Sequence, residues 1–366
     1  MARKLKSDKT LFLATLALLG SSVVMVYSAS AMLAMDRFQQ PYFFLFRQLT
    51  WVVLGGGLLA GVMRINYRLL KQPVVIWTVM GVTTLMLAAV LFSPPINGVR
   101  RWFGIAGIGV QPSELAKIAV IIFTAAILER RMEHVDELAH SLLPIGLVTG
   151  GAAVLIVLEP DFGTAATLLV IVAAMVFAAG LSYRYLFGFA LVALPVIYLV
   201  LASADYRRRR LLAFLDPWAD PLGDGFQVIQ SLIAVGTGGV FGRGLMSGVQ
   251  KLFYLPYPHT DFIYAVIAEE TGLIGATVVL LCFVVITWRG LRVTLYAPDR
   301  FGAFLALGLT TMVALQAFVN MSVVLSLLPT KGITLPFVSA GGSSLLISLL
   351  GMGVLLNISQ HASAET

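Results

Sequence analysis

The sequence KLFYLPYPHTDFIYAVIAEETG, residues 251–272, joins a polar turn to a long apolar run. His259 and Asp261 stand where that run begins, and Glu269 and Glu270 follow about two turns later. Ionisable side chains are costly within a membrane, so each one in an apolar segment is a candidate for function. The stretch therefore predicts a membrane helix with a polar site at its beginning.

The composition favours a polytopic membrane protein. Of the 366 residues, 59% are hydrophobic and only 12% are charged, whereas a soluble domain carries about 25% charged residues. A chain this apolar cannot cover itself with a polar surface. The single cysteine, Cys282, excludes an internal disulfide and any cysteine-based metal motif.

The expected fold class is all-α: one domain, residues 1–366, with about ten transmembrane helices, because ten apolar segments are each about long enough to span a bilayer. The segments are 11–34, 42–64, 74–93, 113–129, 142–158, 164–181, 184–202, 261–288, 302–328 and 334–357. Short tails, 1–10 and 358–366, flank them, and the one long connection, 203–260, follows the seventh segment.

The distribution of Lys and Arg predicts the orientation. With the N-terminus inside, thirteen of these residues fall on the cytoplasmic side and four in the short outer loops, in agreement with the positive-inside rule. Both termini are then cytoplasmic, and the loop 203–260 faces outside. Its amphipathic piece FQVIQSLIAVG could lie in the plane of the membrane interface.

Other ionisable residues lie within the expected helices. Glu114 and Lys117 are three residues apart, so they share a helix face and can pair; alternatively, the pair only packs helices. Arg47 is a second candidate, with snorkelling or helix capping as its alternative. Because neighbours on a helix diverge by roughly 100°, Glu269 and Glu270 cannot both face one cavity, so one of them is expected to be structural.

Asp261 is the strongest candidate for a catalytic carboxylate. It follows LPYPHT, whose two prolines stiffen the approach to the helix, and a carboxylate at the membrane boundary can take a proton from a sugar hydroxyl. The alternative is an N-cap role for Thr260 or Asp261. For His259 the alternative is a loop hydrogen bond. Glu159 and Asp161, in an outer turn, would share a cavity open to the same side.

Four consecutive arginines, Arg207–Arg210, lie in the long outer loop. Guanidinium groups present several fixed donors, an arrangement suited to phosphate and pyrophosphate. The alternative is an anchor to anionic lipid head groups.

Several long strings resemble the SEDS family (shape, elongation, division and sporulation), which comprises FtsW, RodA and SpoVE. Besides the opening stretch they include NGVRRWFGIAGIGVQPSELAK, EPDFGTA, YRRRRLLAFLDPWADPLGDGFQVIQSLIAVGTGG and LPTKGITLPFVSAGGSSLL. The similarity runs from about residue 25 to 358, and QKLFYLP and LPTKGITLPF look more like FtsW and SpoVE than RodA. Tyr257 and Ala340 depart from the family pattern.

The resemblance implies an inner-membrane glycosyltransferase that polymerises lipid II during cell division, with Asp261 as the family's essential extracellular aspartate. The partners implied are a class B penicillin-binding protein (an FtsI-like transpeptidase) and other division proteins of the membrane; nucleic acid is not expected. The candidates for substrate binding are Arg207, Arg210, Trp102, Lys117, Glu114, Arg47, His259 and Lys251.

The implied reaction converts an α-linked donor into a β-linked product, so one displacement with one base suffices. Cations must stabilise the leaving pyrophosphate; Arg207 and Arg210 are the candidates, alone or with a divalent cation such as Mg²⁺ or Mn²⁺. Three alternatives stay open: a lipid II flippase, a RodA-type elongation polymerase, and a scaffold for the transpeptidase. Ionisable groups crowd the outer side, which favours a polymerase over a flippase.

Overall fold

The structure of the protein is a computed structural model, which describes residues 7–95, 98–105, 108–132, 141–185, 187–188, 191, 195, 209 and 212–362. It is a helical bundle with one short hairpin. The long helices are α1 (Lys9–Phe38), α2 (Phe43–Val62), α3 (Pro73–Val90), α4 (Pro112–Arg131), α5 (Leu143–Leu158), α6 (Phe162–Ala178), α10 (Ile263–Leu295), α11 (Arg300–Val324) and α12 (Gly342–Ser359). The shorter elements are η1 (Tyr67–Lys71), η4 (Pro217–Ala219), α9 (Phe226–Gly238), β1 (Phe103–Ile105) and β2 (Ile108–Val110).

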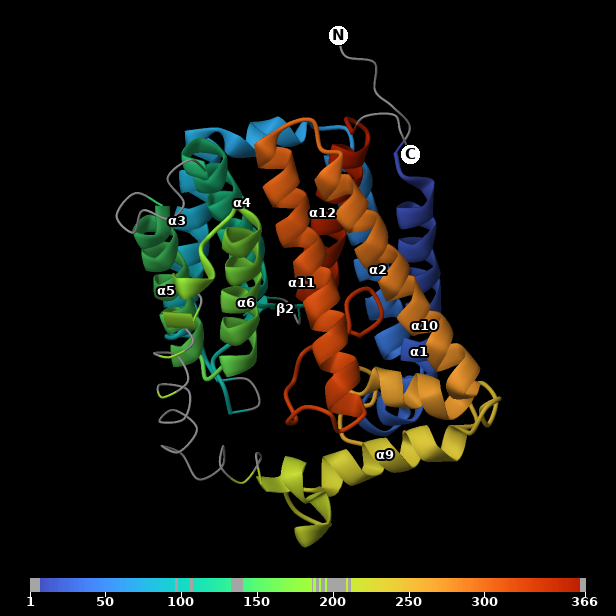
Figure 1. The fold of residues 1–366 in the computed structure, drawn as a ribbon. Coiled ribbons are helices and arrows are strands. Elements are labelled where there is room, and N and C mark those ends of the chain that lie inside the picture. Colours follow the sequence, from blue (N-terminus) through green and yellow to red (C-terminus); the bar gives the residue numbers. More distant parts are fainter. Residues whose placement is uncertain are drawn as a thin grey trace.

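Most long helices run side by side along one axis, with α3 to α6 on one side and α1, α2 and α10 on the other (Figure 1). The core lies around α4, α11 and α12, whose side chains are mostly buried. The helix α9 runs across one end of the bundle (Figure 1). The crosswise direction agrees with the interfacial position expected for FQVIQSLIAVG.

Side-chain caps explain where several helices begin. Asp8 accepts a hydrogen bond from the Leu11 amide of α1, and Asp299 accepts one from the Gly302 amide of α11. The helices α3 and α4 begin at Pro73 and Pro112, where a missing N–H leaves no bond unmade.

The two ends of the bundle differ in the elements they carry. At one end the Asp8 amide donates to Ser359 Oγ at 3.2 Å, and Arg289 pairs with the Asp8 carboxylate at 2.6 Å. The starts of α1 and the ends of α10 and α12 therefore lie together. The helix α9 and the beginning of α10 lie at the opposite end (Figure 1).

Helices occupy nine of the ten predicted segments, and most of the seventh, 184–202, lies outside the described residues. Six helices are apolar and long enough to cross a membrane: α1, α2, α3, α10, α11 and α12. The helices α5 and α6 have only 16 and 17 residues. The chain is thus a multi-pass membrane protein, and the count of ten spans stays a prediction.

The predicted tenth segment, 334–357, begins too early. Its helix starts only at Gly342, and residues 334–341 form a turn. The Leu335 amide donates to Ser339 Oγ at 2.8 Å, and Phe337 has a left-handed φ of 64°. Apolar composition alone did not distinguish this packed turn from a helix.

The eighth helix is broken, which the sequence did not predict. Gly272, inside α10, has φ 67° and ψ −167°, a conformation that glycine adopts readily. The chain segment 239–244 pairs with the break: the Leu273 amide donates to Gly239 O at 2.9 Å, and the Arg243 and Gly244 amides donate at 3.0 Å to the carbonyls of Glu269 and Glu270. Non-helical backbone is stable within a membrane protein where other backbone satisfies it. The part of α10 before Gly272 lies along α9 (Figure 1).

Candidate functional site

The backbone around Asp261 is held by the turn that precedes α12 and by α11. The amide of Ala340 donates to His259 O at 2.9 Å, and Ser339 Oγ donates to Thr260 O at 2.7 Å. On α11, Asn320 Nδ2 donates to Asp261 O at 2.8 Å. Three consecutive carbonyls are therefore fixed, and the position of Asp261 is set from outside its own helix.

The capping alternative for Asp261 is wrong. Phe262 occupies the N-cap of α10, and no side chain caps that helix. The Asp261 side chain instead faces Gly332, where an added Cβ would lie 2.9 Å from Asp261 Oδ2. Asn320 also donates to Ile333 O at 2.7 Å, so one amide fixes both sides of this close approach.

Arg101 and Asp161 are the charged groups that act on Asp261. Arg101 Nε donates to Glu159 O at 2.8 Å, and its guanidinium also donates to Pro160 O. Asp161 caps α6 through the Thr164 amide and accepts from Thr164 Oγ1 at 2.8 Å. Gln111 donates to it at 3.2 Å. The outer turn 159–161 thus brings the loop before β1 and the beginning of α4 to the site.

Two carboxyl groups at the site have raised pKa values. Burial raises the pKa of Asp261 to about 6, with Arg101 lowering it and Asp161 raising it. Burial raises the pKa of Glu159 to about 8, with Asp161 adding to the shift. Both Glu159 carboxylate oxygens are buried without a hydrogen bond, so its neutral form is favoured. Asp261, by contrast, is ionised at pH 7 and basic enough to accept a proton.

Three of the predicted substrate-binding residues belong to the segments that the turn 159–161 contacts. Trp102 directly follows Arg101 and packs over Gly109 of β2. Glu114 and Lys117 open α4, just after Gln111, and form the predicted pair, with Lys117 Nζ 2.8 Å from Glu114 Oε1. Both side chains are buried, and Glu114 Oε2 has no hydrogen-bond partner. The pairing is confirmed; a role toward substrate stays a prediction.

Arg47 and His259 lie near each other on another flank of the site. The His259 ring packs against Phe44, with 4.6 Å between the ring centroids. Burial, together with the charges of Arg37 and Arg47, lowers the pKa of His259 to about 4. The imidazole is therefore neutral at pH 7. Its Nδ1 is buried without a partner, so the loop hydrogen bond offered as its alternative is not observed for this atom.

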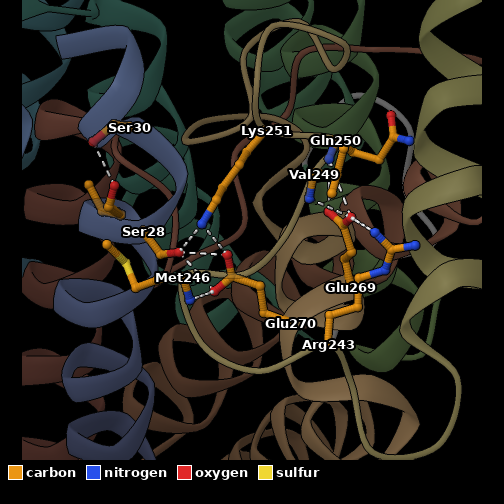
Figure 2. A network of polar contacts seen from close by, with 10 residues as sticks. Ser28, Ser30, Arg243, Met246, Val249, Gln250, Lys251, Glu269 and Glu270 are labelled. Atoms are coloured by element: carbon orange, nitrogen blue, oxygen red, sulfur yellow. Dashed lines mark hydrogen bonds and ion pairs between the residues drawn. The ribbon is translucent and has the colours of Figure 1, made fainter. Parts of the chain in front are cut away.

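Lys251 lies in a separate buried network (Figure 2). Its Nζ is 2.5 Å from Glu270 Oε1 and 2.8 Å from Ser28 Oγ of α1. Glu270 also accepts from the Met246 amide. The structure thus gives Lys251 protein partners and places it apart from the residues around Asp261.

Glu269 supports the same loop from its other side (Figure 2). It accepts from the Val249 amide at 2.8 Å and from the Gln250 amide, and Arg243 lies 4.0 Å away. The two glutamates diverge as expected, but both hold the outer loop. The structural role predicted for one of the two glutamates therefore applies to both, because the loop wraps around both sides of the helix.

Arg207 and Arg210 lie outside the described residues. In the part of the chain that is described, no group of three His, Cys, Asp or Glu side chains could hold a metal ion. These residues therefore do not fit a resident metal site formed by the protein alone.

Sequence reasoning missed two members of the site, Arg101 and Lys331, which were counted only among the four Lys and Arg residues of the short outer loops. Asp161 was expected at a cavity on this side, but its effect on Asp261 was not. Lys331 lies within electrostatic range of Asp161, and its stem packs beside Gly163. The signal was present in the strings RRWF, EPDFGTA and LPTKG, but nothing in their spacing shows that they meet Asp261.

The bundle and its site define a multi-pass membrane protein with a buried carboxyl group of raised pKa just before α10. Residues 9–364 match the family model FtsW/RodA/SpoVE, described as cell cycle protein. The chain belongs to this family.

The relatives extend over nearly the whole chain. It is 44% identical over 359 residues to the probable peptidoglycan glycosyltransferase FtsW of Geobacter sulfurreducens, covering 96% of this chain and 95% of that protein. It is 40% identical over 365 residues to stage V sporulation protein E of Bacillus subtilis, covering 98% and 99%.

Solved structures agree in fold. One, described as structural coordination of polymerization and crosslinking by a peptidoglycan synthase complex, has 32% identity and a TM-score of 0.79, covering 96% of this chain and 97% of the other. The rod shape determining protein RodA of Thermus thermophilus has 27% identity and a TM-score of 0.72, covering 98% of each chain.

Proposed function

We propose that the protein is a peptidoglycan glycosyltransferase that polymerises lipid II into glycan strands during cell division. The observation that carries the proposal is the Asp261 carboxyl, fixed through its backbone and raised in pKa to about 6 beside Arg101. The relatives named FtsW support the class of reaction, and their 44% identity supports the division branch over a RodA-type elongation polymerase.

Asp261 acts as the general base in an inverting transfer. It removes the proton from the acceptor hydroxyl while that oxygen attacks the anomeric carbon of the donor. A base works best when its pKa lies near the operating pH, and a value of about 6 meets this condition. One displacement inverts the anomeric carbon and requires no enzyme nucleophile.

The departing pyrophosphate needs cationic partners. Among the residues that the structure describes, Arg101 is the candidate for binding the pyrophosphate, because the carbonyls of Glu159 and Pro160 orient its guanidinium. Arg207 and Arg210 keep the role that the sequence assigned to them. A divalent cation would need ligands from the pyrophosphate as well as from the protein.

The site faces the exterior, and both chain ends face the cytoplasm. The distribution of Lys and Arg supports this orientation. The bundle agrees with it, because Asp8 and Ser359 meet at one end and α9 crosses the other.

A class B penicillin-binding protein is the proposed partner. The structurally similar complex is described as coordinating polymerization and crosslinking, which are two separate reactions. The protein described here supplies polymerisation, and the partner supplies cross-links. Other membrane proteins of the division machinery are proposed on the same ground.

One assay separates this proposal from the flippase and the scaffold. Purified protein in detergent or liposomes is given labelled lipid II, with and without a class B transpeptidase, and glycan is resolved by length. Polymer from wild type but not from Asp261→Asn supports the proposal. If neither protein makes polymer with the transpeptidase present, and labelled lipid II crosses liposomes at the same rate with both, the flippase reading prevails. No polymer and no transport leaves the scaffold.

A further inference from the structure

Lys251 and Glu270 are the two ends of one closed stretch of chain. They are 19 positions apart, and their ion pair joins Nζ to Oε1 at 2.5 Å (Figure 2). From Lys251 the chain runs to Asp261, near the middle of the stretch, and returns to Glu270 through the first part of α10. We infer that Lys251, Glu269 and Glu270 are positioning residues that hold Asp261 in place for the transfer. This inference rests on the proposed function of Asp261.

The Lys251–Glu270 ion pair, which closes this stretch, is buried in the protein and is not a surface contact. Glu269 and Glu270 are 0% and 1% exposed, and Lys251 is 7% exposed. Buried charges are stable only when their bonds are satisfied. Lys251 bonds Glu270 and Ser28, and the two glutamates together accept from the amides of Met246, Val249 and Gln250.

The closed stretch is also fastened to fixed parts of the bundle. Ser28 belongs to α1, and it donates to both Glu270 oxygens, at 2.6 and 2.8 Å. At the far side of the stretch, Asn320 of α11 holds the Asp261 carbonyl. Asp261 is thus held from α11 on one side and, through the closed stretch, from α1 on the other.

Opening this closure leaves Asp261 held from α11 and from the turn before α12, but no longer from α1. The segment from Lys251 to Asp261 is a succession of turns without a regular helix, so its shape depends on what holds its ends. A displacement of about 1 Å in a catalytic group can lower a rate about 10²-fold. Glu269 and Glu270 are buried and bonded to groups of the protein itself, so substrate binding is expected to change much less.

The test compares polymerisation rates of full-length variants at saturating and limiting lipid II. Glu270→Gln and Lys251→Met each break the closing pair, and Ser28→Ala weakens it while leaving the pair in place. Arg289→Gln is the matched control, because it breaks the Arg289–Asp8 pair at the opposite end of the same helix. Thermal stability is measured for all four, and rates are expressed per folded molecule.

The expected result is a fall in kcat of at least about tenfold for Glu270→Gln and Lys251→Met, with KM within about twofold. Ser28→Ala gives a smaller fall in the same direction. The double variant Lys251→Met with Glu270→Gln is no slower than the slower single variant, because both remove one interaction. Arg289→Gln lowers the melting temperature but keeps kcat.

Two outcomes overturn the inference. In the first, Glu270→Gln or Ser28→Ala melts earlier yet keeps the wild-type kcat, as the control does. In the second, KM rises while kcat stays, which would make these residues part of substrate binding. If Glu270→Gln does not fold, the kcat of Ser28→Ala decides whether the inference holds. Failure of the proposed function looks different, because wild type itself would then make no polymer.

Discussion

Gly332 faces Asp261 so closely that a Cβ on Gly332 would lie 2.9 Å from Asp261 Oδ2. A side chain at position 332 would therefore collide with the carboxylate in its present orientation. The contact joins the loop after α11 to the turn before α10, and neither segment reveals it in sequence.

Gly332→Ala is expected to lower polymerisation about tenfold or more with little loss of stability. The new methyl group meets only the far end of a side chain, which can rotate away, so the fold tolerates it while the base is turned from its position. Glycan yield and melting temperature are measured together. Ala340→Gly, in the neighbouring turn, serves as the control, because it changes one methyl group near the site without facing the Asp261 carboxylate. Normal yield from Gly332→Ala would show that the carboxylate does not need this orientation.

Asp261→Asn is expected to abolish most activity, since loss of a general base typically lowers a rate about 10²–10⁴-fold. The same variant is expected to be more stable than wild type at pH 7. The folded pKa of about 6 lies above the unfolded value of 3.8. Asp261 therefore contributes stability below pH 4, and the contribution is lost as the pH rises through 6. Asn carries no charge to bury.

Melting temperatures of both proteins at pH 4 and pH 7 check the sign. The advantage of Asp261→Asn should be larger at pH 7 than at pH 4. An equal difference at both pH values would mean that the ionised Asp261 carboxylate does not destabilise the fold.

The rate of polymerisation should fall on the acid side with a midpoint near pH 6, because only the ionised Asp261 accepts a proton. Arg101→Gln removes the charge that lowers this pKa, so the midpoint should move upward. Initial rates between pH 5 and 8 measure both. A midpoint near 4 in wild type would place the titrating group elsewhere.

Glu159 is expected to make the fold sensitive to alkaline pH. Its folded pKa of about 8 lies above the unfolded 4.5, so its stabilising contribution is complete below pH 4.5 and is lost as the pH rises through 8. The drop in melting temperature from pH 7 to pH 9 should therefore be smaller in Glu159→Gln than in wild type. Glu129→Gln, which breaks the ion pair of Glu129 with Lys71 away from the site, is the control. Identical drops in all three proteins would contradict the burial of a neutral Glu159.

Orientation can be tested with single cysteines in a Cys282→Ser background. Leu222→Cys, on the outer loop and 89% exposed in the wild type, should react with an impermeant thiol reagent in intact spheroplasts. Thr366→Cys should react only after lysis. Reaction of Thr366→Cys in intact spheroplasts would reverse the topology.

The sequence predicted the helices well because membrane spans are long and nearly free of charge. It predicted Asp261 because a carboxylate at the start of such a span is costly and therefore informative. It did not reveal the break at Gly272, since a glycine before an apolar run is common in unbroken helices.

The rest of the site depends on contacts between distant segments. Arg101, Asp161 and Lys331 converge on one place from three separate loops, and hydropathy carries no information about such meetings. Lys251 shows the converse error. It belongs to the same sequence motif as Asp261, yet in the structure its charge is paired within the protein, by Glu270 and Ser28.

The pairing of segment 239–244 with the broken α10 also orders the biosynthesis of the protein. During translation Ser28 emerges first, the outer loop much later, and Glu269 and Glu270 later still. The loop is therefore synthesised before the part of α10 that fastens it. A nascent chain stalled before residue 269 would leave segment 239–244 without its partners on α10, and the site can mature only after α10, α11 and the turn before α12 have been made.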